Sequence, residues 1–122
     1  MKRLTCFAAI GGEISEGPLW WGDSLWWIDV PKGQLHRCPQ AGARWVTWDL
    51  GMPVGCVAPI AHSSNQVVAA LQHGFYQITL GNDGTIKELT QINDPEVHLP
   101  DNRFNDGKCD PQGRFWAGTM SM

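Results

Sequence analysis

The feature that most restricts the fold of this chain is a set of short apolar strand patterns that recur at a nearly constant interval. Strong runs of aromatic and β-branched residues begin near Leu25, Val67 and Phe115, which are 42 and then 48 residues apart. Further short runs bounded by turn residues accompany each of them. Repeats of about 40–50 residues with four short strands are typical of a β-propeller. The sequence therefore predicts an all-β propeller fold with about two and a half blades.

The segments between the expected strands carry residues that close β-hairpins. Gly and Asn allow positive φ angles, and Pro fixes the corner of a turn. Such residues bound four expected strands, at residues 24–30, 66–71, 75–80 and 114–120. The apolar run 4–10 is expected to form one more strand. The longer second interval is expected to come from a polar loop over residues 93–103, and the polar run 102–110 is also interpreted as a loop.

Size and charge exclude several classes of protein. The 122 residues have the usual length of one domain, and the net charge is −3. The nine Lys and Arg residues are scattered with no run of three, so no nucleic-acid partner is expected. No segment approaches the ~20 apolar residues of a membrane helix, so no membrane partner is expected either. The apolar run 4–10 is interpreted as a strand and not as a signal peptide, so a cytoplasmic location is predicted.

Cysteine and tryptophan are both expected to serve packing. The four cysteines, Cys6, Cys38, Cys56 and Cys109, are far apart and form no CxxC pair, so a structural zinc site is not expected. In a cytoplasmic chain they should be reduced and buried. The seven tryptophans lie in or beside expected strands, which favours packing between blades over stacking on a sugar.

Two places in the sequence carry candidate ligand-binding residues. Glu16 precedes a Gly-Pro turn, where it is either a solvated loop charge or, at the inner end of a propeller strand, a ligand for a hard cation. Arg103 and Asn105 are two residues apart and would share a face in an extended segment. A guanidinium and a carboxamide on one face suit a polyhydroxylated or carboxylated ligand, although Asn105 to Gly107 could equally be a simple turn.

Two long stretches resemble the gluconolactonase/regucalcin-like six-bladed propellers: EGPLWWGDSLWWIDVPKGQLHR from Glu16, and NRFNDGKCDPQGRFWAGTM from Asn102. The resemblance covers essentially the whole chain but only the N-terminal part of that family's domain. Six blades of about 42 residues need about 250 residues. The resemblance therefore implies that residues 1–122 are the N-terminal part of a six-bladed propeller domain.

The resemblance also implies a site and a reaction. It implies one divalent ion in the central channel, Ca²⁺ or Zn²⁺ first, with Mg²⁺, Mn²⁺ or Fe²⁺ as alternatives. Glu16 matches the family's first-blade metal ligand, and Arg103 and Asn105 match residues that line its substrate pocket. The implied reaction is hydrolysis of a sugar lactone, in which the ion activates the carbonyl or a water. The family's other metal ligands have no match in this sequence, and no catalytic residue is assigned.

Two functions stay open at this point. The first is a metal-dependent sugar lactonase. The second is a non-catalytic, metal- or partner-binding propeller fragment that completes its ring by oligomerisation. Two and a half blades cannot close a ring and would leave apolar blade faces bare. Self-association or a missing C-terminal part is therefore expected, and whether the chain alone is an enzyme stays open.

Overall fold

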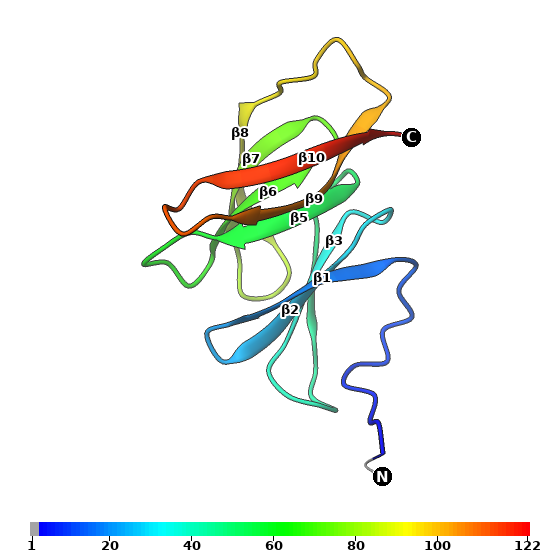
Figure 1. The fold of residues 1–122 in the computed structure, drawn as a ribbon. Coiled ribbons are helices and arrows are strands. Elements are labelled where there is room, and N and C mark those ends of the chain that lie inside the picture. Colours follow the sequence, from blue (N-terminus) through cyan, green and yellow to red (C-terminus); the bar gives the residue numbers. More distant parts are fainter. Residues whose placement is uncertain (1–2) are drawn as a thin grey trace.

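The computed structural model describes residues 3–122, which form ten antiparallel strands and no helix (Figure 1). The first sheet has the order β1 (Ser15–Trp21), β2 (Ser24–Asp29), β3 (Gln34–Cys38) and β4 (Val46–Asp49). The second sheet has the order β5 (Val54–Pro59), β6 (Gln66–Leu71), β7 (Gly74–Leu80) and β8 (Ile86–Asn93). The third sheet pairs β9 (Asn102–Cys109) with β10 (Phe115–Ser121). Two four-stranded blades and two strands of a third match the predicted pattern.

Two predictions about individual segments were wrong. The run 4–10 forms no strand: it runs beside the first sheet (Figure 1) and makes one backbone hydrogen bond there, from Gly42 N–H to the Phe7 carbonyl (3.1 Å). One bond cannot replace the ladder that a strand needs. The polar run 102–110 is mostly strand β9 rather than a loop, because it pairs along its length with β10. The connecting loop is correspondingly shorter, covering residues 94–101.

Large side chains fill the space between the first two sheets. Trp26 and Trp48 stack there with ring centroids 5.5 Å apart and planes 9° apart. The Trp48 indole N–H donates to the Gly81 carbonyl at 2.8 Å, which satisfies its buried polar atom. The cluster also contains aliphatic residues from both sheets, among them Ile28, Leu35, Val67, Leu71, Ile78 and Leu80. This cluster is the main hydrophobic core.

A smaller cluster joins the second sheet to β9. Its buried members are Cys56, Ala70 and Phe104, and Phe75 packs on Phe104 with ring centroids 4.6 Å apart. One glycine allows β5 and β9 to approach closely at this place. A Cβ on Gly55 would meet the Phe104 backbone at 2.6 Å, so β5 and β9 touch through their main chains.

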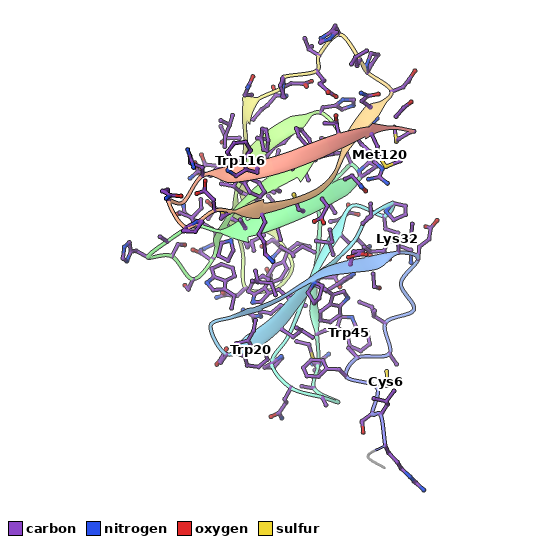
Figure 2. All side chains as sticks on the ribbon, viewed as in Figure 1. Cys6, Trp20, Lys32, Trp45, Trp116 and Met120 are labelled. Carbon is purple, nitrogen blue, oxygen red and sulfur yellow. The ribbon has the colours of Figure 1, made fainter. Side chains whose placement is uncertain are left out.

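The packing prediction for tryptophan and cysteine is confirmed only in part. Trp26, Trp27 and Trp48 are buried, whereas three others are exposed (Figure 2): Trp20, Trp45 and Trp116. Cys38 and Cys56 are buried and unpaired, but Cys6 and Cys109 are exposed. A run of aromatic residues predicts that a strand is present. It does not predict which face of the strand a neighbouring sheet will cover.

Residues 3–122 contain no helix with the length and apolar character needed to cross a bilayer. The cytoplasmic location stays a prediction.

Candidate functional site

The first strand of each sheet carries one residue more than its partner. In β1 the pairing with β2 shifts between Glu16 and Leu19, so that Gly17 and Pro18 oppose a single residue. In β5 the shift falls at Gly55. Such β-bulges gather next to functional sites, where they redirect side chains. The third first strand, β9, has a bulge as well, at residues 105–106. The first strand of every sheet is therefore irregular at one place along its length.

The bulge in β9 sets which of its residues face the cluster around Cys56. Phe104 packs in that cluster, and a Cβ on Gly107 would lie 2.7 Å from the Cys56 sulfur. Residues three apart cannot share a face of a regular strand. They do so here because Asn105 and Asp106 together oppose one residue of β10. Both of these polar side chains are exposed.

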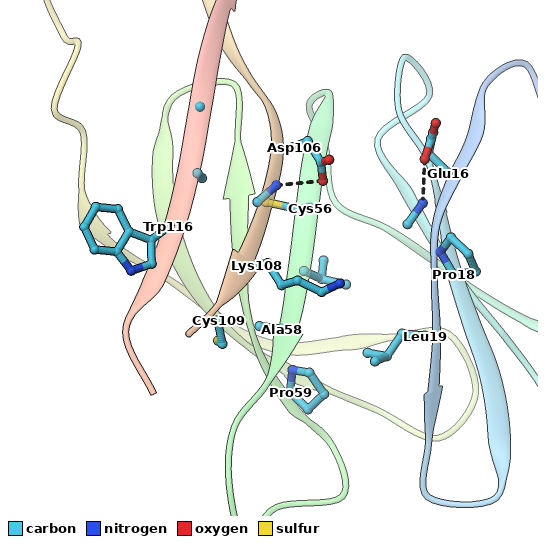
Figure 3. Close-up of a pocket in the computed structure, with 15 residues that line it drawn as sticks. Glu16, Pro18, Leu19, Cys56, Ala58, Pro59, Asp106, Lys108, Cys109 and Trp116 are labelled. Carbon is cyan, nitrogen blue, oxygen red and sulfur yellow. Dashed lines mark hydrogen bonds between the residues drawn. The ribbon is translucent and has the colours of Figure 1, made fainter. Parts of the chain in front are cut away.

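An open cleft of about 1050 Å³ lies along the three first strands (Figure 3). In this view β5 runs between β1, which carries Glu16, and β9, which carries Asp106. The cleft is lined by residues 16–19, 56–59, 106–109 and 116–118. Two acidic side chains that are 90 positions apart in the sequence therefore line one cleft.

Glu16 stands on a well-anchored part of the chain. Its carboxylate is exposed and accepts a hydrogen bond from the Gly17 N–H at 3.1 Å. Just before it, the buried Asp29 carboxylate accepts N–H groups of Glu13 (2.7 Å) and Ile14 (3.3 Å). Burial alone would raise the pKa of Asp29, but these bonds and the nearby Lys32 together lower it. The start of β1 is thereby held to β2.

The donor chemistry of Glu16 fits a divalent cation, but only as one ligand of several. A carboxylate oxygen is a normal ligand for a hard cation, which takes about six to eight oxygens. Within residues 3–122 no group of three or more His, Cys, Asp or Glu side chains is placed to hold an ion. This part of the chain therefore offers a single carboxylate arm of such a site, not a complete coordination shell.

Arg103 and Asn105 lie on β9 but do not line the cleft. Arg103 is half-buried, and its Nη1 donates to the Phe104 carbonyl at 2.9 Å, which leaves its other donors available. Their role toward a substrate stays a prediction. The cleft instead contains Asp106 and Lys108, which sequence reasoning did not single out. They belong to the same polar run, but a spacing rule cannot reveal a bulge.

Two cysteines line the cleft, the exposed Cys109 and the buried Cys56, and the surroundings of Cys56 oppose a role as a nucleophile. Burial first, and then the negative charge of Asp106, raise the pKa of its thiol to about 12. The reactive form of a cysteine is the thiolate. Cys56 therefore stays protonated at neutral pH and acts as a small packing residue.

Several proteins resemble this chain in sequence or in fold. The putative sugar lactone lactonase YvrE of Bacillus subtilis is 33% identical over 89% of the chain. The solved structure of a luciferin-regenerating enzyme matches 91% of the chain with a TM-score of 0.83 and 26% identity. A structure described as a calcium-binding protein, regucalcin, from Agrobacterium tumefaciens matches 88% with a TM-score of 0.76 and 28% identity.

These neighbours confirm the all-β fold as that of regucalcin-like propeller proteins. The chain spans 36% of the length of the lactonase, and 37% and 35% of the two solved chains. The profile of the family described as SMP-30/Gluconolactonase/LRE-like region matches residues 14–122. On this match, the chain belongs to the SMP-30/gluconolactonase/LRE-like family.

Proposed function

We propose that this chain supplies the first blades of a propeller that hydrolyses a sugar lactone with the help of a divalent cation. The observation that carries the proposal is that Glu16 and Asp106 line one cleft beside the bulges of their strands. The family and its lactonase member give the chemical class of the substrate. Among the candidate ions, Ca²⁺ is favoured by the calcium-binding relative and Zn²⁺ is the alternative.

The residues of this chain have separate roles in the proposal. Glu16 provides one carboxylate ligand to the cation. When bound, the cation would polarise the lactone carbonyl or lower the pKa of a water. Arg103 and Asn105 hold the hydroxyl groups of the sugar, since a guanidinium fork and an amide together offer several donors and an acceptor. Orientation of this kind accelerates a reaction by fixing the attacked atom before water arrives.

The test is hydrolysis of glucono-1,5-lactone by the purified propeller to which this chain supplies the first blades, with the release of acid as the measured signal. Activity should vanish with a chelator and return with Ca²⁺ or Zn²⁺. Glu16→Gln should remove most of the metal-dependent rate, because it removes the charge of the ligand. Glu13→Gln is the matched control, since Glu13 is exposed, three residues away and outside the cleft. Activity that is insensitive to the chelator would overturn the metal requirement.

The substrate residues have their own test. Arg103→Ala should raise KM for the lactone several-fold and leave the affinity for the cation unchanged. The control is Arg44→Ala, which removes an equal charge from an exposed site outside the cleft. Unchanged kinetics in Arg103→Ala would remove this residue from the substrate pocket.

A second candidate function rests on the edge of the third sheet. Within residues 3–122, β10 pairs only with β9, and Trp116 and Met120 on it are exposed. An open edge with apolar side chains is a site for pairing. We propose as the alternative a non-catalytic propeller that completes its ring with copies of itself. Light scattering tests it: a discrete oligomer without lactonase activity would favour the alternative, and a 13.5 kDa monomer would oppose it.

A further inference from the structure

Two arginines of this chain lie over tryptophan rings, but their electrostatic surroundings differ. The guanidinium carbon of Arg114 is 5.7 Å from the Trp116 ring centroid, and its Nε donates to the Asp110 carboxylate at 2.6 Å. The guanidinium carbon of Arg37 is 5.6 Å from the Trp26 centroid and 5.8 Å from that of Trp48. No ion pair joins Arg37 to an acidic residue within residues 3–122, and its buried Nε has no acceptor.

The position of Arg37 is fixed by the first sheet. Arg37 on β3 is the direct cross-strand partner of Trp26 on β2. Trp48 comes from β4 and stacks on Trp26. A planar guanidinium lies well against such rings and loses little further freedom when it binds a ligand. Arg37 is thus a pre-oriented cation rather than a mobile surface charge.

The space in front of Arg37 is a small pocket between the first two sheets. Its volume is about 210 Å³. The second blade contributes Ser64 and Asn65 from the β5–β6 connection, and residues 80–82 from the end of β7 and the turn after it. The nearby carbonyl acceptors are already engaged. The Gly81 carbonyl accepts the Trp48 indole N–H (2.8 Å), and the Leu80 carbonyl accepts the Asn65 amide (3.3 Å).

Donors are therefore in excess in this pocket. Ser64 and Asn82 are exposed, and neither side chain makes a hydrogen bond within residues 3–122. Together with Arg37 they present a guanidinium fork, a hydroxyl and an amide to the same small volume. A group that accepts hydrogen bonds and carries negative charge would satisfy all three.

We infer that this pocket binds a small oxyanion, either phosphate or a carboxylate. Arginine forks match both groups with two parallel hydrogen bonds. The volume of about 210 Å³ is below the ~300 Å³ at which sites for larger ligands begin. The site is separate from the cleft, because the two have no lining residue in common.

The test is titration of the purified protein with inorganic phosphate, and separately with acetate, at constant ionic strength set by chloride. The NMR signal of the Arg37 Nε–H and the tryptophan fluorescence should change in a saturable way with at least one of the two anions. Arg37→Gln should weaken that binding about tenfold or more, the loss expected for a charge-assisted pair of hydrogen bonds. Saturation by phosphate alone assigns a tetrahedral anion, and saturation by acetate alone assigns a carboxylate.

Arg114→Gln is the matched control, because it removes the same charge from a stack that already has its carboxylate. It should bind the anion as the native protein does. Asn82→Ala changes an exposed turn residue, so it tests the pocket even if Arg37→Gln fails to fold. It should weaken binding by a smaller factor. The inference is overturned if neither anion gives a saturable response, if chloride gives an equal one, or if both Arg37→Gln and Asn82→Ala bind normally.

Discussion

The second sheet meets its two neighbours in different ways. Against the first sheet it packs large side chains, with the stacked Trp26 and Trp48 among aliphatic residues. Against β9 it packs the smaller cluster around Phe104, and at Gly55 the two strands also touch through their main chains, because no Cβ separates them. The first contact depends on large side chains, and the second depends in addition on the absence of one. Neighbouring blades can therefore be joined by side-chain packing alone or by packing together with a close approach of their backbones.

The largest loss of stability is expected when a large side chain is removed from the packing between the first two sheets. Trp48→Ala deletes a fully buried indole and its hydrogen bond to Gly81. We expect a loss of about 3–5 kcal/mol in the free energy of unfolding, from lost burial and the cavity left behind. Urea unfolding measures it. Trp20→Ala, at an exposed position, should cost less than about 1 kcal/mol. An equal loss of unfolding free energy in the two variants would contradict the distinction between buried and exposed tryptophans.

Addition of one methyl group should break the second contact. A Cβ at position 55 would meet the carbonyl of Phe104 at 2.6 Å and the Asn105 nitrogen at 2.8 Å. These are main-chain atoms that cannot move aside singly, so Gly55→Ala should cost about 1–3 kcal/mol. Gly118→Ala is the control, because its Cβ would meet nothing within 4 Å. The near-ultraviolet signal of the Trp26–Trp48 stack should be the same in both variants. A change in that signal would show that the two contacts are not independent.

The smallest effect concerns a third kind of contact, a charge that holds the chain before β1. The pKa of Asp29 is lowered from its ordinary 3.8, because hydrogen bonds to its carboxylate outweigh burial. The stability that the ionised carboxylate contributes is therefore fully present above about pH 4, and it is lost as the pH falls through the lowered pKa. Asp29→Asn should cost about 1 kcal/mol and remove this pH dependence. Hydrogen exchange at the Glu13 amide measures it. Unchanged protection of that amide in acid would contradict this role.

The strands that the sequence predicted well are those whose signal is local. β2 and β6 each contain a run of apolar residues between turns, with aromatic or β-branched members, and they lie within one residue of their predicted ranges. β9 was predicted as a loop because its residues are mostly polar or Gly. What makes it a strand is its pairing with β10 and the close approach of Gly55, both of which are tertiary. The apolar run 4–10 shows the reverse case, with a strand-like pattern and no partner.

The residues of the candidate site also differ in whether a local sequence signal could reveal them. Glu16 was found from its place before Gly17 and Pro18, and it does line the cleft, but these two residues form the bulge inside β1 and not the predicted turn. Asp106 was missed, since the argument from Arg103 and Asn105 assumed regular alternation along the strand. The bulge breaks that alternation after Asn105. The pocket at Arg37 carried no signal at all, because its parts come from two sheets and are brought together only by their packing.

The bulges also bear on how chain length can change during evolution. Loss of either Asn105 or Asp106 would leave Phe104 and Gly107 on the same face, since the pairing with β10 would merely become regular. Loss of a residue elsewhere in β9 would turn part of the strand over. We therefore expect insertions and deletions among relatives to gather at positions 17–18, 55 and 105–106. Each such event would reshape the wall of the cleft while the core behind it stays in register.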